Sequence, residues 1–258
     1  MPFFKYHEKK VYFNTYGKKG PYLLLLHGNS VASAMFKKEI KRFYGKRFKV
    51  FTFDYPGHGK SEKVETLPQD FWFENSKVAA ALFERLGVDR AYVIGTSGGA
   101  LVGLNLALER PGLVIKLICD SFIGEKIPEE MADSIKQARL AEKNGEMGFA
   151  WFMLHGFKWE KVVDMDTQML LNAAKTGQKL YHKELSEIIM PVLLTGSRTD
   201  ETVPGMEAVI NDLKSKSNMF ESYVFDTGSH MTMLTRNYDF ARKALEFFNF
   251  EVLSSRRG

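Results

Sequence analysis

A serine flanked by glycines, in the run Gly95-Thr96-Ser97-Gly98-Gly99, is well placed in this chain to act as a nucleophile. Apolar residues from position 91 predict a buried strand before it, and small apolar residues over 100–108 predict a buried helix after it. A serine on such a sharp turn exposes its hydroxyl, and the helix N-terminus beside it favours developing negative charge. The alternative is a glycine-rich turn with a bystander serine. A catalytic role for Ser97 therefore requires a base, an acid and an oxyanion hole elsewhere in the chain.

Strand-like and helix-like runs alternate along most of the chain. They predict an α/β protein with a mostly parallel central sheet and helices on both of its faces. Buried strands are expected over 21–26, 48–53, 91–94, 114–119, 191–194 and 221–225, with an antiparallel edge strand or hairpin over 5–16. Helices are expected over 34–44, 71–86, 100–108, 205–214 and 238–248. Residues 254–258 are expected to be frayed.

Distinctive polar residues follow four of the predicted strands, namely Asn29, Ser97, Asp200 and His230. The carboxyl ends of parallel strands share one edge of a sheet, and sites in such folds lie there. We therefore expect these four residues to converge. Four polar signals at equivalent strand ends are stronger evidence than any one of them.

The chain resembles the α/β-hydrolases over nearly its whole length. The resemblance rests on His27-Gly28-Asn29, Asp54-Tyr55-Pro56-Gly57-His58-Gly59, the turn 95–99, Asp200 and His230. The order serine, aspartate, histidine also matches that family. The resemblance implies a nucleophile elbow at Ser97 and a catalytic triad completed by Asp200 and His230. It further implies an oxyanion hole made by the backbone N–H groups of Asn29 and Gly98.

Acyl-transfer chemistry requires these residue types. A serine hydroxyl is a poor nucleophile until an imidazole accepts its proton, and the imidazole needs a carboxylate to hold its tautomer. The tetrahedral intermediate carries negative charge on the former carbonyl oxygen. Losing one hydrogen-bond donor to that oxygen typically costs about 3 kcal/mol.

The acid and the base each have an alternative interpretation. Asp120 also follows a predicted strand and is the rival acid, and Asp200 could instead cap a helix. His230 could be structural, although it follows a glycine turn at a strand end. The sequence favours Asp200 as the acid and His230 as the base.

Residues 121–188 interrupt the alternation, because they contain no strand-like run. Helices are predicted over 128–143, 146–154, 162–174 and 180–189, in a stretch rich in Met, Phe and Trp. α/β-Hydrolases carry a helical lid at this position, which implies a core of residues 1–120 and 189–258 under a lid of residues 121–188. Most of these apolar side chains would pack the lid onto the core, and a few would line a cavity. His155 and His182 are expected on the lid surface, whereas His27 and His58 are expected to tie core loops together.

Length, composition and charge limit the class of protein that this chain can be. A chain of 258 residues, 45% hydrophobic and 26% charged, fits one large soluble α/β domain with an insertion. The net charge of +5 is spread along the chain, so a nucleic-acid surface is not expected. Cys119 is the single cysteine and is expected to be buried. Because we find no apolar run typical of a signal peptide or a membrane span, we expect a cytoplasmic protein without a membrane partner.

The sequence contains neither a complete P-loop nor a known metal-binding motif. Gly59-Lys60-Ser61 is similar to the end of a P-loop, but Asp54 stands where that motif requires a glycine. No His-Glu-x-x-His or paired-cysteine pattern occurs in the sequence, so we expect neither a dedicated metal site nor a cofactor.

The function expected is hydrolysis of a small or medium apolar ester, or a related acyl compound, through an acyl-enzyme on Ser97. Serine at the elbow argues against the family's epoxide hydrolases and haloalkane dehalogenases, which use a carboxylate nucleophile. Carbon–carbon bond hydrolases and perhydrolases share the triad and stay open. So does a receptor that binds a small ligand and turns over slowly. The partner expected is the small-molecule substrate, for a monomer or a homodimer.

Overall fold

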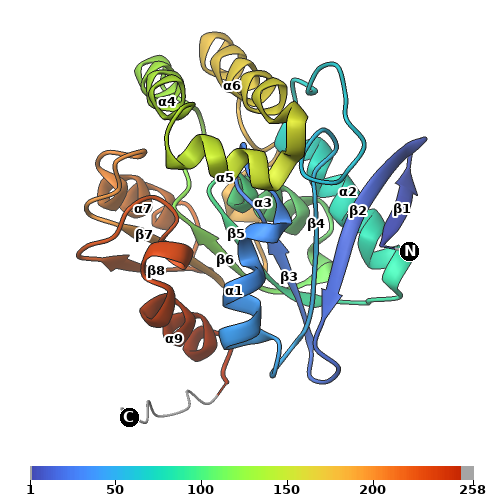
Figure 1. Cartoon of the computed structure of the whole chain (residues 1–258). Coiled ribbons are helices and arrows are strands. Elements are labelled where there is room, and N and C mark those ends of the chain that lie inside the picture. Colours follow the sequence, from blue (N-terminus) through green and yellow to red (C-terminus); the bar gives the residue numbers. More distant parts are fainter. Residues whose placement is uncertain (1, 251–258) are drawn as a thin grey trace, which may run out of the picture.

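Eight strands of residues 2–250, the part of the chain that the computed structural model describes, form one twisted sheet (Figure 1). The strands are β1 (Phe3–Tyr6), β2 (Lys9–Tyr16), β3 (Tyr22–Leu26), β4 (Lys49–Phe53), β5 (Ala91–Thr96), β6 (Val114–Asp120), β7 (Val192–Ser197) and β8 (Phe220–Phe225). They lie in the order β1-β2-β4-β3-β5-β6-β7-β8. Pairing is parallel from β4 to β8, and β1 and β2 add an antiparallel hairpin at one edge. The predicted α/β class is confirmed, and the expected fraying over 254–258 lies outside the described residues.

Helices cover both faces of this sheet. The helices are α1 (Lys37–Glu39), α2 (Phe71–Leu86), α3 (Gly98–Glu109), α7 (Met206–Lys214), α8 (Thr232–Thr235) and α9 (Asn237–Phe247). Alternate side chains of β3 explain the two layers: Leu24 and Leu26 join the core beneath α2, α3 and α7, whereas Leu23 and Leu25 join the core beneath α1 and α9. The expected helix over 34–44 is a succession of a 3₁₀ turn, a short α-helix and a π turn.

Three further helices lie between β6 and β7 in sequence. They pack against one another over the carboxyl ends of the parallel strands (Figure 1). They are α4 (Glu129–Glu142), α5 (Glu146–His155) and α6 (Trp159–Thr176). The helix expected over 180–189 is wrong, because only a 3₁₀ turn at Leu185–Glu187 forms there. Leu180, Leu185 and Ile188 are buried without a continuous helix, and the Leu180 N–H bonds to the Glu125 carbonyl instead of a helical partner. Within residues 2–250, none of the helices has the length and apolar character needed to cross a bilayer.

Glycines allow α3 to start immediately beside the sheet. A Cβ on Gly99 would lie 2.1 Å from the Leu26 carbonyl oxygen, and one on Gly95 would lie 2.2 Å from the Gly99 carbonyl oxygen. Between them Ser97 has φ 55° and ψ −125°, a strained backbone that L residues rarely adopt. A side chain at either glycine would therefore collide with backbone atoms of the neighbouring strand or helix.

Replacing Gly99 by alanine should lower the free energy of unfolding by about 2 kcal/mol, because β3 and α3 must move apart. Gly112→Ala is the matched control, since a Cβ there meets nothing within 4 Å. Urea titration of both variants measures the difference. Equal stabilities would contradict the close approach.

Candidate active site

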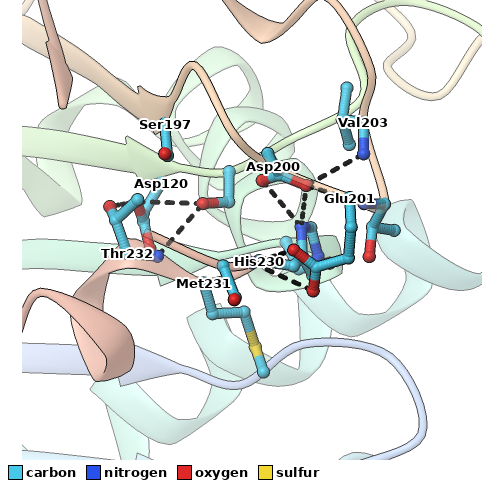
Figure 2. A network of polar contacts seen from close by, with 12 residues as sticks. Asp120, Ser197, Asp200, Glu201, Val203, His230, Met231 and Thr232 are labelled. Carbon is cyan, nitrogen blue, oxygen red and sulfur yellow. Dashed lines mark hydrogen bonds and ion pairs between the residues drawn. The ribbon is translucent and has the colours of Figure 1, made fainter. Parts of the chain in front are cut away.

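Ser97, Asp200 and His230 meet at the carboxyl edge of the sheet, although they follow three different strands. The His230 ring lies between the other two: Nε2 is 2.9 Å from Ser97 Oγ, and Nδ1 is 3.0 and 3.1 Å from the two oxygens of Asp200. Figure 2 shows the contact between Asp200 and His230. A carboxylate only accepts hydrogen bonds, so Nδ1 carries the proton and Nε2 is the acceptor that faces the serine hydroxyl.

Asp200 is held in place by the backbone that follows it. Its side chain has no exposed surface, and its Oδ1 also accepts the N–H groups of Thr202 and Val203 at 3.0 and 2.9 Å. These donors offset the loss of solvent around the buried carboxylate. The carboxylate therefore has one orientation, and that orientation faces His230.

The loop that carries His230 is held in place by hydrogen bonds to the loop after β7, which carries Asp200. Glu201, directly after Asp200, accepts the His230 N–H at 3.1 and 3.3 Å (Figure 2). Thr199 Oγ1 donates to the Gly228 carbonyl and accepts the Gly228 N–H, each at 3.1 Å. These hydrogen bonds therefore fix the backbone of His230 relative to the loop that carries Asp200.

Asp120 anchors the other side of the histidine loop and does not contact the imidazole. This fully buried carboxylate lies beside Thr232 (Figure 2) and accepts a hydrogen bond from its Oγ1. It also accepts the Met233 N–H at 3.0 Å, just beyond His230. It also accepts the hydroxyls of Thr96 and Thr195, each at 2.9 Å. Burial raises the pKa of Asp120, and these hydrogen bonds oppose the rise. Asp200, which the sequence favoured over Asp120, is the aspartate beside the His230 imidazole.

The two expected oxyanion donors are neighbours: Asn29 lies in the loop after β3, and Gly98 is the first residue of α3. A Cβ on Gly98 would lie 1.8 Å from Asn29 Oδ1, so the two residues are in direct contact. Neither N–H bonds to another backbone group within residues 2–250. The Asn29 side chain is itself held: its amide nitrogen donates to Asp166 at 3.0 Å, and Trp72 Nε1 donates to its oxygen at 3.1 Å.

A cavity of about 290 Å³ opens above the serine and the histidine. Core residues form its floor, and α4, α5 and α6 contribute Ile135, Trp151 and Leu170 to its mostly apolar wall. Arg139 and Glu142 of α4 add charge at this wall. In the described part of the chain, no group of three or more His, Cys, Asp or Glu side chains is placed to hold a metal ion.

Two histidines and one aspartate lie outside the cluster of Ser97, His230 and Asp200, and the sequence predicted the position of only one of them. The expectation that His27 ties core loops together is confirmed, because its ring accepts the Tyr55 N–H at 3.2 Å. The expectation that His155 lies on the surface is wrong, since it is buried between α5 and two core loops. Sequence reasoning missed Asp166. The available signal was its spacing, because it falls on the apolar stripe of α6 that includes Val162 and Leu170.

A family model described as "alpha/beta hydrolase fold" matches residues 21–154, just over half of the chain. The chain belongs to the alpha/beta hydrolase fold family. The resemblance drawn from the sequence motifs is thereby confirmed.

Individual relatives of this alpha/beta hydrolase are distant. The chain is 31% identical over 114 residues to a 2-hydroxy-6-oxononadienedioate/2-hydroxy-6-oxononatrienedioate hydrolase of Burkholderia vietnamiensis, a match that covers 43% of this chain and 39% of that protein. It is 28% identical over 111 residues to a 2-hydroxy-6-oxo-6-phenylhexa-2,4-dienoate hydrolase of Comamonas testosteroni, covering 42% and 38%. The chain thus spans about two fifths of the length of these curated relatives. A solved structure titled "Est816 as an N-Acyl homoserine lactone degrading enzyme" has the same fold, with a TM-score of 0.76, 22% identity and coverage of 95% of this chain and 100% of that one.

The buried His155 makes the stability of this protein depend on pH. Its Nδ1 accepts the Gly59 N–H and its Nε2–H donates to the Ser30 carbonyl, each at 2.9 Å. Burial, and then the neighbouring His58, lowers the pKa of His155 from 6.5 to about 4. The unfolded chain therefore binds this proton at a higher pH than the folded chain, and stability decreases as pH falls from 6.5 towards 4.

We expect the loss of unfolding free energy between about pH 7 and pH 5.5 to be about 1 kcal/mol smaller in His155→Gln than in the wild type. Glutamine keeps one acceptor and one donor but does not titrate. Urea unfolding at both pH values measures the difference. Identical pH dependence in the two proteins would show that folding does not lower the pKa of His155.

Proposed function

We propose that this chain is a serine hydrolase, with Ser97 as nucleophile, His230 as general base and Asp200 as the acid that orients it. The observation that carries this proposal is the continuous hydrogen-bonded chain from Ser97 Oγ through the His230 ring to Asp200, at the floor of an apolar cavity. Nucleophile, base and orienting carboxylate within hydrogen-bond reach are the geometric requirement for this chemistry.

In the acylation step, Ser97 Oγ attacks the substrate carbonyl carbon while His230 Nε2 takes the hydroxyl proton. The carbonyl oxygen gains the electron pair, and the N–H groups of Asn29 and Gly98 stabilise its negative charge. The intermediate then expels the alcohol, which receives its proton from His230. Asp200 stabilises the charged imidazolium throughout.

In the deacylation step, water replaces the alcohol. His230 removes a proton from the water molecule as its oxygen attacks the acyl carbon, and a second tetrahedral intermediate forms in the same oxyanion hole. Its collapse breaks the bond to Ser97 Oγ, which regains a proton from His230. The products are a carboxylic acid and the free enzyme.

The cavity supports a small or medium apolar acyl group as substrate. Its volume of about 290 Å³ and its aromatic and aliphatic wall suit an uncharged chain of limited length. We further propose that residues 121–188 act as a lid over the core formed by residues 1–120 and 189–258. Support comes from α4, α5 and α6, whose side chains contribute to the cavity wall.

A second candidate is hydrolysis of a carbon–carbon bond next to a ketone. The names of the Burkholderia and Comamonas relatives describe substrates that contain a ketone and no ester, so their hydrolysis breaks a carbon–carbon bond. The same base and oxyanion donors serve such a reaction. We favour the ester because the cavity wall is mostly apolar, whereas those substrates are carboxylic acids.

Wild-type protein should hydrolyse p-nitrophenyl esters of short to medium acyl length, and Ser97→Ala should lower kcat/KM by at least about 10⁴-fold. Release of p-nitrophenol across a series of acyl lengths measures both effects. Ser215→Ala, the same substitution at an exposed serine that does not line the cavity, controls for handling of the mutant protein. Turnover that survives in Ser97→Ala would assign the reaction to another residue. Absence of turnover, with a melting temperature raised by a specific small ligand, would favour a receptor instead.

Asp200→Asn should lower kcat by about 10⁴-fold, because the imidazole loses the carboxylate that selects its tautomer. Asp120→Asn should lower kcat much less, and should instead lower the melting temperature because buried donors lose their acceptor. Steady-state kinetics and thermal unfolding of both variants measure this contrast. A larger kinetic loss in Asp120→Asn would reverse the assignment of the acid.

A further inference from the structure

Asp166 of α6 is a buried carboxylate that the hydrolytic steps do not use. Its side chain has no exposed surface, and its Oδ2 accepts hydrogen bonds from Asn29 Nδ2 at 3.0 Å and from the Ser30 N–H at 3.1 Å. His58 Nε2 lies 3.2 Å from the same oxygen, and Arg139 Nη1 lies 2.9 Å from Oδ1. Hydrogen-bonding groups from two core loops and the cation of Arg139 in α4 therefore converge on one side chain of the inserted helices.

The charge of Asp166 is compensated inside the protein. Burial alone would raise the pKa of this carboxyl, but the Arg139 guanidinium and then His58 outweigh burial and hold the pKa below its usual value. A buried charge pair of this kind is weak evidence for stability, because desolvation offsets most of its attraction. The geometry it imposes on its partners is a better reason for its presence here.

Two of its partners, Asn29 and Ser30, belong to the loop after β3, called here the oxyanion loop because it contains the expected oxyanion donor. Ser30 has a left-handed backbone with φ 55°, which an L residue adopts only when its surroundings impose it. The inserted helices hold it on both sides: Asp166 accepts its N–H, and His155 of α5 donates to its carbonyl at 2.9 Å. The side chain of Asn29 is fixed between Asp166 and Trp72. The Asn29 N–H, the expected oxyanion donor, therefore sits in a segment whose conformation depends on α5 and α6.

We propose that Asp166 is a positioning residue for the oxyanion hole, so that the inserted helices complete the reactive site as well as covering it. This inference rests on the proposed hydrolase function and adds a residue to it. An oxyanion donor acts on charge that is present in the transition state and not in the ground state. Displacing the donor should therefore lower kcat while leaving KM unchanged, which loss of packing around the cavity would not do.

The first test compares wild type with Asp166→Asn, which keeps the side-chain size and one acceptor oxygen but removes the charge. We expect kcat for a p-nitrophenyl ester to fall about 100-fold at unchanged KM. The matched control is Asp164→Asn on the same helix, where the side chain is 58% exposed and pairs with Lys143. It removes the same charge without touching the loop, and its kinetics should equal those of the wild type.

A pair of inhibitors separates positioning from loss of structure. An alkyl trifluoromethyl ketone adds to Ser97 and forms a tetrahedral oxyanion, whereas the methyl ketone of the same length remains trigonal. In Asp166→Asn, the Ki of the trifluoromethyl ketone should rise by about the same factor as kcat falls, and the Ki of the methyl ketone should not change.

A second pair of variants carries the same test if Asp166→Asn does not fold. His155→Ala removes the donor to the Ser30 carbonyl, so kcat and affinity for the trifluoromethyl ketone should both fall. His155→Gln retains a donor and an acceptor and should restore both. Failure of glutamine to restore them, in a folded protein, would contradict positioning through this contact.

The outcomes distinguish this inference from the function on which it rests. If wild-type protein shows neither Ser97-dependent turnover nor inhibition by the trifluoromethyl ketone, the hydrolase proposal itself fails. If the wild type is active and Asp166→Asn keeps full kcat, only the positioning role fails. Equal weakening of both ketones, with a raised KM, would likewise overturn positioning and indicate a structural role.

Discussion

The close approach of α3 to the sheet fixes where every other part of the site must lie. Because Gly95 and Gly99 have no side chains, the helix begins against the ends of β3 and β5, and Ser97 is forced into a strained turn between them. The serine hydroxyl then points away from the packed layers towards the open edge of the sheet. Everything that acts on it must therefore reach it from loops at that edge, and not from the core below.

Loops at the end of a parallel sheet have backbone N–H groups without strand partners, and buried carboxylates satisfy many of them here. Asp54 accepts the N–H groups of Ser33 and Lys60 at 2.8 and 2.7 Å. Asp120 accepts the N–H of Met233 beyond His230. Asp166 accepts the N–H of Ser30 in the loop after β3, and Asp200 accepts the N–H of Val203 in its own loop after β7. Charge-assisted hydrogen bonds of this type are short and directional, so each loop gains one preferred conformation. The precision of the site comes from these carboxylates as much as from the residues proposed to react.

The sequence predicted the sheet and the convergence of Ser97, Asp200 and His230 because both follow from local patterns. Buried parallel strands appear as apolar runs, and their carboxyl ends must share one edge. Spacing could not separate Asp120 from Asp200, since both follow strands and only the path of the histidine loop decides which one faces the ring. Asp166 and His155 escaped prediction because their partners lie in core loops far away along the chain. The helix expected over 180–189 was wrong because its apolar spacing records burial of irregular chain against the core, which periodicity cannot distinguish from a helical face.

In the proposed mechanism, the contacts of Asp166 link the helices that wall the cavity to the loop that would stabilise the transition state. Moving α6 away from the core would break its hydrogen bonds to Asn29, Ser30 and His58 together, and would expose the carboxylate and Arg139 to water. The strained Ser30 backbone would then lose the contacts that hold it. Beside a mostly apolar cavity wall, the electrostatic effect of an N–H donor is greater than it would be in open solvent. In the proposed mechanism, the same helices that wall the cavity would thus also hold the Asn29 N–H in place, so chemistry at Ser97 would depend on their packing against the core.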